Sequence, residues 1–434
     1  LERGQAEETL TNIGTEEKTV LLTNPFTGSN YTYKVKSANT SEQSAKFEFL
    51  ENGRLVITAS NIVITAGDNQ MDDLIIMGNY NEINTGDLDD VVRVGYANDQ
   101  NIFVTYNDNT INTGSGNDYV RYRGTNTIDM GDGDHDACLA AYYSNRSSST
   151  ITNAETSTYR EGYSYTTVAN LDGIEGFARQ GSEGDCKIFS IINSIGLCQG
   201  TGKLSDYITV EPYNYVENGT TKQAYNVTFD KFNKNFVSKD ENLVGTVSVT
   251  QSEVDSFKGV YGDADTRLFM VALNKLVNVN YGYTGWAEAI SNIAADTNNQ
   301  IDRHMLANML IFGTKNYSYK NLSKSIKNDF IVYWELHKEG KIPAMNISIH
   351  EGANDFSIGL INNHAFAIKN VVYDYDDDDL NYVELVNPWD DRDCVRFSFN
   401  KFFSFTGSQV YCHATDPTRL TALVNQYKTE HNIN

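Results

Sequence analysis

The chain has 434 residues, enough for two or three domains of ordinary size, and 40% of them are hydrophobic, so packed cores are expected. Asp and Glu number 57 against 34 Lys and Arg, and the net charge of −23 argues against nucleic acid and anionic membranes as partners; it suits hard cations such as calcium, or simply a solvated acidic surface. No apolar run is long enough for a transmembrane helix, so no transmembrane segment is expected.

Short strands are predicted in residues 1–60, which we expect to form a separate β-rich segment. Apolar and β-branched residues alternate there, with Asn and Gly between the stretches. The predicted strands are Thr19–Leu22, Tyr31–Lys36, Lys46–Leu50 and Leu55–Thr58. No motif in this segment points to a function.

Residues 61–140 contain an internal repeat, which predicts a parallel β-solenoid. Three segments align, Glu82–Arg93, Thr110–Arg121 and Thr127–Cys138, and a weaker copy lies at 63–76. The equivalent isoleucines are Ile64, Ile83, Ile111 and Ile128, at intervals of 19, 28 and 17 residues. We expect one apolar side chain of each strand to stack on the next turn, with glycine permitting the tight corners. On this interpretation the longest interval is one and a half turns, and Ile102 fills the gap.

The corners of the repeat resemble the RTX calcium-binding nonapeptide, G-G-x-G-x-D-x-U-x. Gly114–Val120 matches it well, Gly86–Val92 has Leu88 in place of the second glycine, and Gly131–Asp136 matches with one residue of slippage. In that family, Asp carboxylates and loop carbonyls of successive turns bind calcium. The resemblance implies calcium as a cofactor, with ligands among Asp87, Asp90, Asp118, Asp134 and Asp136. The alternative is a metal-free solenoid whose Asn and Asp residues serve the turns.

Residues 141–170 are rich in Ser, Thr and Tyr and lack periodic apolar positions, which predicts a polar linker. Exposed polar loops are where proteases cut, so this segment is a candidate site of self-cleavage.

The remaining residues, 171–434, are predicted to form one α+β domain. Apolar periodicity predicts helices at Cys186–Leu197, Thr266–Val277 and Trp286–Ala295. Strands are predicted at Ala344–Ile349, His364–Tyr373, Tyr382–Asn387 and Cys394–Phe399. Helices followed by antiparallel strands are typical of the α+β class.

Three segments of this domain carry the residue types of a cysteine nucleophile and its partners. Cys186 begins a predicted helix, where the helix dipole favours the thiolate. Gln180 precedes it and is positioned to donate its amide to an oxyanion, together with the Cys186 N–H. His364 begins one predicted strand and Asn387 ends the next. A hairpin of these strands brings the two side chains together, with the Asn orienting the imidazole.

In this order, Q-x-x-x-G-D-C, H-A-aromatic and N-P-W resemble the calpain family of papain-type cysteine proteases. The resemblance spans about residues 171–416. It implies a papain-like core, hydrolysis of protein or peptide substrates, and a Cys186–His364–Asn387 triad with Gln180 in the oxyanion hole. It also implies that Trp389 shields the contact between His and Asn from water.

The sequence departs from the family pattern at Lys187, Asn363 and Asp390, which replace an aromatic residue and two glycines. The lysine either lowers the pKa of the neighbouring thiol or points to solvent. None of the three changes affects the triad, but they alter the surroundings in which a substrate binds.

Other interpretations remain open. Each triad residue taken alone is also explained as a structural residue, which leaves a catalytically inactive calpain-like module on a calcium-binding, adhesin-type solenoid. A transferase such as a transglutaminase is disfavoured because the third residue is Asn rather than Asp. The remaining cysteines are interpreted as structural and Asp376–Asp379 as a solvated hairpin tip; those cysteines are Cys138, Cys198, Cys394 and Cys412.

The composition, with 32 Gly and only 5 Pro, suits a secreted or cell-surface protein of bacterial type. The polar stretch at the N-terminus is not typical of a signal peptide.

Overall fold

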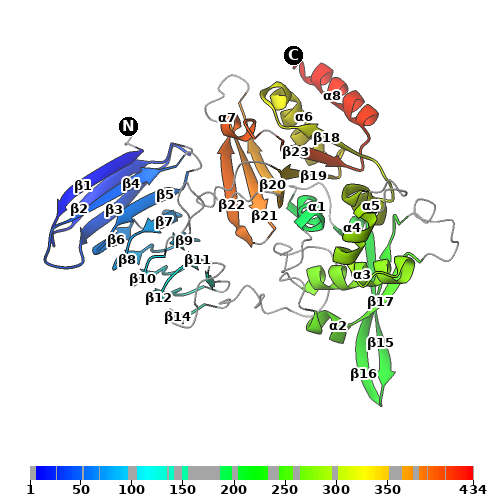
Figure 1. The fold of residues 1–434 in the computed structure, drawn as a ribbon, viewed down its shortest axis with the longest axis horizontal. Helices are drawn as coiled ribbons and strands as arrows, with labels where there is room; N and C mark the ends of the chain where they lie inside the picture. The colour runs from blue at the N-terminus through cyan, green and yellow to red at the C-terminus, as the bar shows by residue number, and fades with distance from the viewer. Residues whose placement is uncertain are drawn as a thin grey trace. The chain divides into compact units, whose positions relative to one another are not determined.

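The computed structural model describes most of the chain. The described residues are 6–25, 27–50, 53–67, 69–95, 105–133, 136–140, 149–154, 186–197, 204–232, 244–257, 264–295, 302–350, 364–374, 381–388, 390–405 and 407–433. They form two compact units, each with its own hydrophobic core (Figure 1). The first is built on the described residues up to Ala154, and the second on the described residues from Cys186 onward.

The first unit is a parallel β-solenoid, as the repeat predicts. Two seven-stranded sheets enclose its core, in the orders β1-β4-β5-β7-β9-β11-β13 and β14-β12-β10-β8-β6-β3-β2. The strands are β1 (Glu7–Ile13), β2 (Lys18–Thr23), β3 (Asn30–Ser37), β4 (Gln43–Phe49), β5 (Leu55–Ala59), β6 (Ile62–Ala66), β7 (Asp73–Met77), β8 (Glu82–Asn84), β9 (Val91–Val94), β10 (Thr110–Asn112), β11 (Tyr119–Tyr122), β12 (Thr127–Asp129), β13 (Ala137–Ala140) and β14 (Thr150–Thr152).

Equivalent side chains stack in register from turn to turn. Ile64 pairs with Ile83, and Ile111 pairs with Ile128, which pairs in turn with Ile151 of β14. In the facing sheet the matching positions are taken by Leu55, Leu74, Val92, Val120 and Cys138. A strand of three to five residues buries little by itself, so this stacking supplies the core of the solenoid.

The strand pairing corrects one prediction about the repeat. β8, which contains Ile83, pairs directly with β10, which contains Ile111. β9 likewise pairs directly with β11. The interval of 28 residues is therefore one longer turn rather than one and a half turns, and Ile102, which lies outside the described residues, fills no gap in the ladder.

The strands predicted within residues 1–60 are all present, and they belong to the same two sheets as the repeats. β1 pairs antiparallel with β4 and β4 with β5, while β2 pairs antiparallel with β3 and β3 with β6. Pairing becomes parallel from β5 and β6 onward. At the other end, β14 lies within the segment predicted as a linker, most of which is outside the described residues.

The second unit contains a three-stranded sheet, β15-β16-β17, and a six-stranded sheet, β18-β23-β19-β20-β21-β22. Its elements are α1 (Cys186–Leu197), η2 (Leu204–Asp206), β15 (Ile208–Glu217), β16 (Thr220–Phe229), β17 (Thr246–Thr250), α2 (Gln251–Ser256), α3 (Ala264–Tyr281), α4 (Trp286–Ala295), α5 (Arg303–Ile311), β18 (Tyr317–Asn321), η4 (Lys324–Ile326), α6 (Lys327–Lys338), β19 (Ala344–Ile349), β20 (His364–Val372), β21 (Tyr382–Asn387), β22 (Asp390–Ser398), α7 (Phe399–Phe402), β23 (Gln409–His413) and α8 (Pro417–His431).

The predicted helices and strands of this unit are all present, and α1, α4, β19 and β21 have the predicted bounds. The predicted order of helices first and strands later is incomplete. The sheet β15-β16-β17 follows α1, and the helices α6 and α8 lie among and after the later strands. Most of β15 is exposed, and Pro212 interrupts the apolar alternation that begins with Ile208 and Val210, so the sequence pattern does not predict the whole strand. None of the helices within the described ranges is long and apolar enough to cross a membrane.

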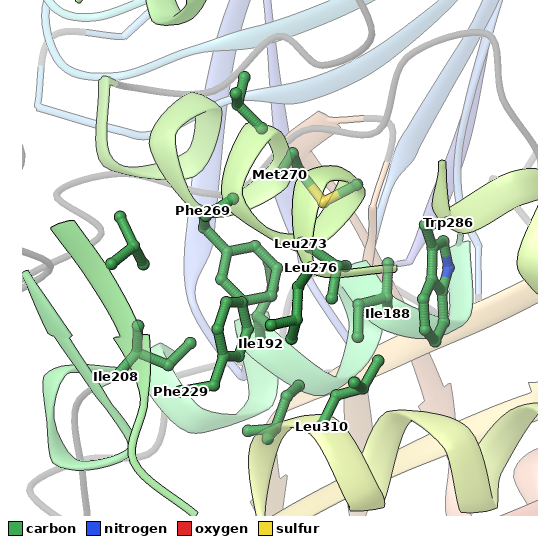
Figure 2. Packing of buried hydrophobic residues seen from close by; sticks show 14 of the residues in the cluster. Ile188, Ile192, Ile208, Phe229, Phe269, Met270, Leu273, Leu276, Trp286 and Leu310 are labelled. Atoms are coloured by element: carbon green, nitrogen blue, oxygen red, sulfur yellow. The ribbon is translucent and has the colours of Figure 1, made fainter. Parts of the chain in front are cut away.

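Helix α1 lies at the centre of the core of the second unit. Ile188 and Ile192 are four residues apart and so share one face of the helix. Figure 2 shows them among Phe229 of β16, Leu273 of α3 and Leu310 of α5, all of them buried. Burial of each such side chain stabilises the fold by about 2 kcal/mol, so the helix that begins with the candidate nucleophile is firmly held.

Candidate functional site

Cys186 is the first residue of α1 and is partly exposed. The first amides of a helix have no partner within the helix, and the positive end of the dipole lies there, so a thiolate is favoured at this position. Cys138 and Cys412 are buried. Burial raises the pKa of Cys412 to about 12, which keeps that thiol protonated. Of the three thiols described, only Cys186 combines access to solvent with a helix N-terminus.

His364 is the first residue of β20 and is 5% exposed. It pairs with Ile349 of β19 across the sheet. Its ring meets that of Phe366 edge to face, with the centroids 5.0 Å apart. Residues two apart in a strand share a face, so His364 and Phe366 point to the same side of the sheet.

Asn387 is the last residue of β21, which pairs antiparallel with β20. Ala367 lies opposite Val386, and one further step along this register brings Asn387 opposite Phe366. The predicted hairpin is therefore present, and the backbone of Asn387 lies near the strand end that carries His364. The side chain of Asn387 lies outside the described residues, as do Gln180 and Trp389.

Packing brings the three elements together, because α1 packs against β20 and β19. One helix that begins with a cysteine thus lies on a strand that begins with a histidine, beside a strand that ends with an asparagine. A nucleophile, a base and an orienting amide in this order are the parts needed for acyl transfer through a thioester.

Lys187 points into the protein, so the alternative in which it points to solvent does not hold. Its Nζ lies 3.1 Å from Nε2 of His304 on α5. Burial lowers the pKa of Lys187, and the nearby Arg303 lowers it further, whereas Cys186 acts in the opposite direction.

A circuit of buried polar side chains continues from this pair and was not predicted. The Asn308 amide donates to the His304 carbonyl oxygen at 2.8 Å, and the Asn346 amide donates to Ser190 Oγ at 2.6 Å. The ring nitrogens of His413 lie 3.2 Å and 3.1 Å from Oδ1 of Asn308 and Asn346. We call these five residues, together with Lys187, the polar circuit. It links α1, α5, β19 and β23, so no local sequence pattern signals it.

The aspartates of the repeat form a ladder inside the solenoid. Oδ1 of Asp90 accepts a hydrogen bond from the Asp72 N–H at 2.7 Å, and Oδ1 of Asp118 accepts one from the Asp90 N–H at 2.8 Å. Oδ1 of Asp136 accepts the Asp118 N–H at 2.7 Å. All four are buried. Asp72 was missed in the sequence, although it lies one turn of 18 residues before Asp90.

The Oδ2 atoms of these aspartates make this corner of the solenoid a candidate cation site. Oδ2 of Asp90 and of Asp118 is buried, and no group within the described ranges donates a hydrogen bond to either atom. Burial raises the pKa of Asp90 to about 8 and that of Asp118 to about 6, although hydrogen bonds from the Asp72 and Asp90 N–H groups and from Thr85 and Thr113 act in the opposite direction.

One backbone carbonyl lies beside the Asp136 carboxylate. A Cβ atom on Gly133 would lie 2.1 Å from the Gly116 carbonyl oxygen and 2.6 Å from both carboxylate oxygens of Asp136. The described residues contain no cluster of three His, Cys, Asp or Glu side chains able to hold a metal, so a site here needs backbone carbonyl oxygens as further ligands. Oxygen donors of this kind fit calcium rather than zinc.

The other two predicted ligands, Asp87 and Asp134, are not part of the buried carboxylate ladder that the structure describes. Asp87 is exposed and accepts a hydrogen bond from Ser115 Oγ at 2.8 Å, so it lies on the outside of the corner. Asp134 is outside the described residues.

A scan of the sequence against protein-family models gives no match, and a search of curated proteins gives none either. The two family resemblances therefore rest on the motifs quoted above.

Proposed function

We propose that the second unit is a calpain-like cysteine endopeptidase with a Cys186–His364–Asn387 triad. The observation that carries the proposal is the packing of α1 on β20, together with the pairing of β20 with β21. Further support comes from the partial exposure of Cys186 at a helix N-terminus, where its thiolate is stabilised.

In the proposed reaction, the Cys186 thiolate attacks the carbonyl carbon of a peptide bond. Gln180 and the Cys186 N–H donate hydrogen bonds to the oxyanion that forms. The C–N bond then breaks, the leaving amine takes a proton from the His364 imidazolium, and an acyl-enzyme remains. His364 removes a proton from water, which attacks the thioester and releases the carboxylic acid and the thiolate. Asn387 keeps the imidazole oriented throughout, and Trp389 excludes water from their contact.

We also propose that calcium binds the first unit at the corner lined by Asp90, Asp118 and Asp136, with Asp134 as a further ligand; Asp87 lies outside the corner and is not part of this proposal. The buried Oδ2 atoms of Asp90 and Asp118, which accept no hydrogen bond from the described residues, support this proposal. Bound calcium would neutralise the stacked carboxylates and order the solenoid. Ordering by calcium suits a protein that folds after export, secreted or at the cell surface.

The test is cleavage of casein, an unstructured protein, by the wild type and by Cys186→Ala, each with calcium and with EGTA. Wild type is expected to cleave and Cys186→Ala to be inactive. The matched control is Cys412→Ala, which removes a thiol that burial keeps protonated and should leave cleavage intact. Activity in Cys186→Ala would rule out the triad.

The comparison between calcium and EGTA distinguishes a solenoid that controls activity from one that serves only as a scaffold. Cleavage only with calcium ties activity to the acidic corners, whereas cleavage in EGTA makes the solenoid a scaffold. No cleavage by correctly folded wild type under either condition would favour an inactive calpain-like module.

A further inference from the structure

Lys187 follows the proposed nucleophile directly, and its side chain ends on a fixed partner. An ammonium group has three hydrogen-bond donors and no acceptor, so protonated Lys187 donates to Nε2 of His304. The proton of a neutral His304 then resides on Nδ1. A lysine held in this way keeps a constant position relative to the first turn of α1.

His304 is itself immobilised. It is 4% exposed, and its ring stacks on that of Tyr411 with the centroids 3.8 Å apart and the planes at 13°. Its backbone N–H donates to the Asp302 carboxylate, which caps α5, at 2.8 Å. Burial holds the pKa of His304 well below its usual range, and Lys187 and His413 reinforce the effect. His304 therefore stays neutral near pH 7 and remains an acceptor for the lysine.

The polar circuit fixes the backbone of the same lysine. Ser190 Oγ donates to the Lys187 carbonyl oxygen at 2.9 Å and accepts from the Asn346 amide. The ammonium of Lys187 thus contacts α5, and its carbonyl oxygen accepts from Ser190 of the same helix, which in turn accepts from Asn346 of β19.

Titratable groups from several elements act on Lys187 and His304. Cys186, Asp302 and Arg303 act on Lys187. Arg303, His350 and His413 act on His304. Arg303 and the histidines disfavour a further positive charge on the pair. The Cys186 thiolate favours the ammonium on Lys187, and by reciprocity the ammonium favours the thiolate.

We propose that Lys187, held by His304, is a positioning residue that stabilises the thiolate of Cys186 in addition to His364. A role of Lys187 in catalysis rests on the proposed function, but its effect on the pKa of the Cys186 thiol does not. Lys187 takes the position of an aromatic residue in the family pattern and adds a positive charge on the residue next to Cys186. As the pH rises and Lys187 loses its proton, this stabilisation disappears.

The test measures the thiol directly, without a substrate. The full chain is alkylated with iodoacetamide across a pH series, and modification of Cys186 is followed by mass spectrometry of its peptide. The midpoint of the rate profile reports the pKa of Cys186. Wild type should have a midpoint below about 8.5, the ordinary thiol value. Lys187→Met should raise it by about one unit, whereas Lys187→Arg, which keeps the charge, should raise it less.

Variants of His304 test whether the position of the Lys187 ammonium matters in addition to its charge. His304→Leu removes the acceptor and should raise the midpoint, while His304→Gln, whose carbonyl oxygen accepts a hydrogen bond, should restore it in part. Lys320→Met removes an exposed lysine of β18 and should leave the midpoint unchanged. If Lys187→Met does not fold, as judged by circular dichroism, the two His304 variants and Lys187→Arg decide the matter.

The outcomes distinguish this inference from the protease proposal. A low wild-type midpoint that is unchanged in folded Lys187→Met overturns the role of the lysine and leaves the triad standing. A midpoint unchanged in His304→Leu overturns the role of the histidine. A wild-type midpoint near the ordinary thiol value overturns the inference and also removes support for Cys186 as the nucleophile.

Discussion

Burial keeps two histidines of the second unit, His337 and His413, neutral near pH 7. His337 is buried, with Nδ1 2.7 Å from the Ile342 carbonyl oxygen and Nε2 3.1 Å from Ser194 Oγ. A carbonyl oxygen only accepts, so the proton is on Nδ1, and Nε2 accepts from the serine hydroxyl. Burial lowers the pKa of His337 to about 4 and that of His413 to about 3.

This arrangement predicts acid sensitivity of the second unit. In the unfolded chain, His337 binds a proton near pH 6.5, but in the folded protein it does so only near pH 4. Stability is therefore full above pH 6.5 and falls as the pH drops towards 4. At pH 4.5 we expect the protonation of His337 alone to lower the free energy of unfolding by about 2.5 kcal/mol. Urea unfolding at pH 7.5 and pH 4.5 measures this loss.

The control for acid sensitivity is His337→Gln, which removes the titrating group. The variant should be less stable than wild type at pH 7.5 but should lose less stability on acidification. An equal loss in both proteins would assign the acid sensitivity to other groups.

At the proposed active site, Asn387→Ala should lower kcat by roughly 10²-fold and leave KM nearly unchanged, because an unoriented imidazole transfers protons less efficiently. Steady-state cleavage of a peptide substrate measures both constants. The matched control is Asn370→Ala, which lies further along β20 and should keep wild-type kcat. A tenfold rise in KM with unchanged kcat would instead indicate a role in substrate binding.

At the scale of elements, the solenoid contains amide ladders as well as the carboxylate ladder. The Asn81 N–H donates to Oδ1 of Asn109 at 3.0 Å, and the Asn109 N–H donates to Oδ1 of Asn126 at 3.1 Å. The second polar atom of the Asn109 side chain is also hydrogen-bonded, because Nδ2 donates to the Gly78 carbonyl oxygen at 3.1 Å. Oδ2 of Asp90 and of Asp118 accepts no such bond from the described residues. The amide corner is satisfied by protein groups, which is why the carboxylate corner is the candidate cation site.

Stacked glycines limit substitution at the corners. A Cβ on Gly114, whose φ is +93°, would lie 1.9 Å from the Gly86 carbonyl oxygen. Gly114→Ala should therefore destabilise the first unit by more than about 3 kcal/mol, through both a clash and a strained backbone. Thermal unfolding followed by circular dichroism measures the loss.

Substitutions at two further glycines distinguish the effect of the steric clash from that of the strained backbone. Gly86 has a φ of +105° but open space around a Cβ, so Gly86→Ala should cost about 1 to 2 kcal/mol. Gly14 has open space and no positive φ, and Gly14→Ala should be nearly neutral. Equal losses at Gly114 and Gly86 would show that close stacking of the carbonyls does not constrain the turn.

At the scale of the whole molecule, two units with separate cores predict two unfolding transitions. Calcium should raise only the transition of the first unit, because the carboxylate ladder lies there; the gain is about 2.7 kcal/mol at a free concentration 100 times Kd. Scanning calorimetry with calcium, with magnesium and with EGTA measures the shift.

The variant for this prediction is Asp90→Asn, which keeps the acceptor for the Asp72 N–H but removes the charge. It should reduce the calcium response, whereas Asp108→Asn, at an exposed position of the same unit, should not. A calcium shift in the second transition, or none in the first, would contradict the assignment.

The sequence by itself determined the solenoid, the helices and strands that carry the candidate triad, and the order Cys186, His364, Asn387 along the chain. These features depend on apolar periodicity and short motifs, which are local signals. It did not reveal that the 28-residue interval is one turn, because strand pairing is a tertiary choice. It also missed β15, a mostly exposed strand in which Pro212 interrupts the apolar alternation.

Only the tertiary structure decided the direction of Lys187. Its partner His304 is 117 residues away in the chain, and the polar circuit joins residues of two helices and two strands. A lysine at this position points to solvent or into the core according to whether the core offers a buried acceptor. That acceptor exists only once α1 and α5 pack together.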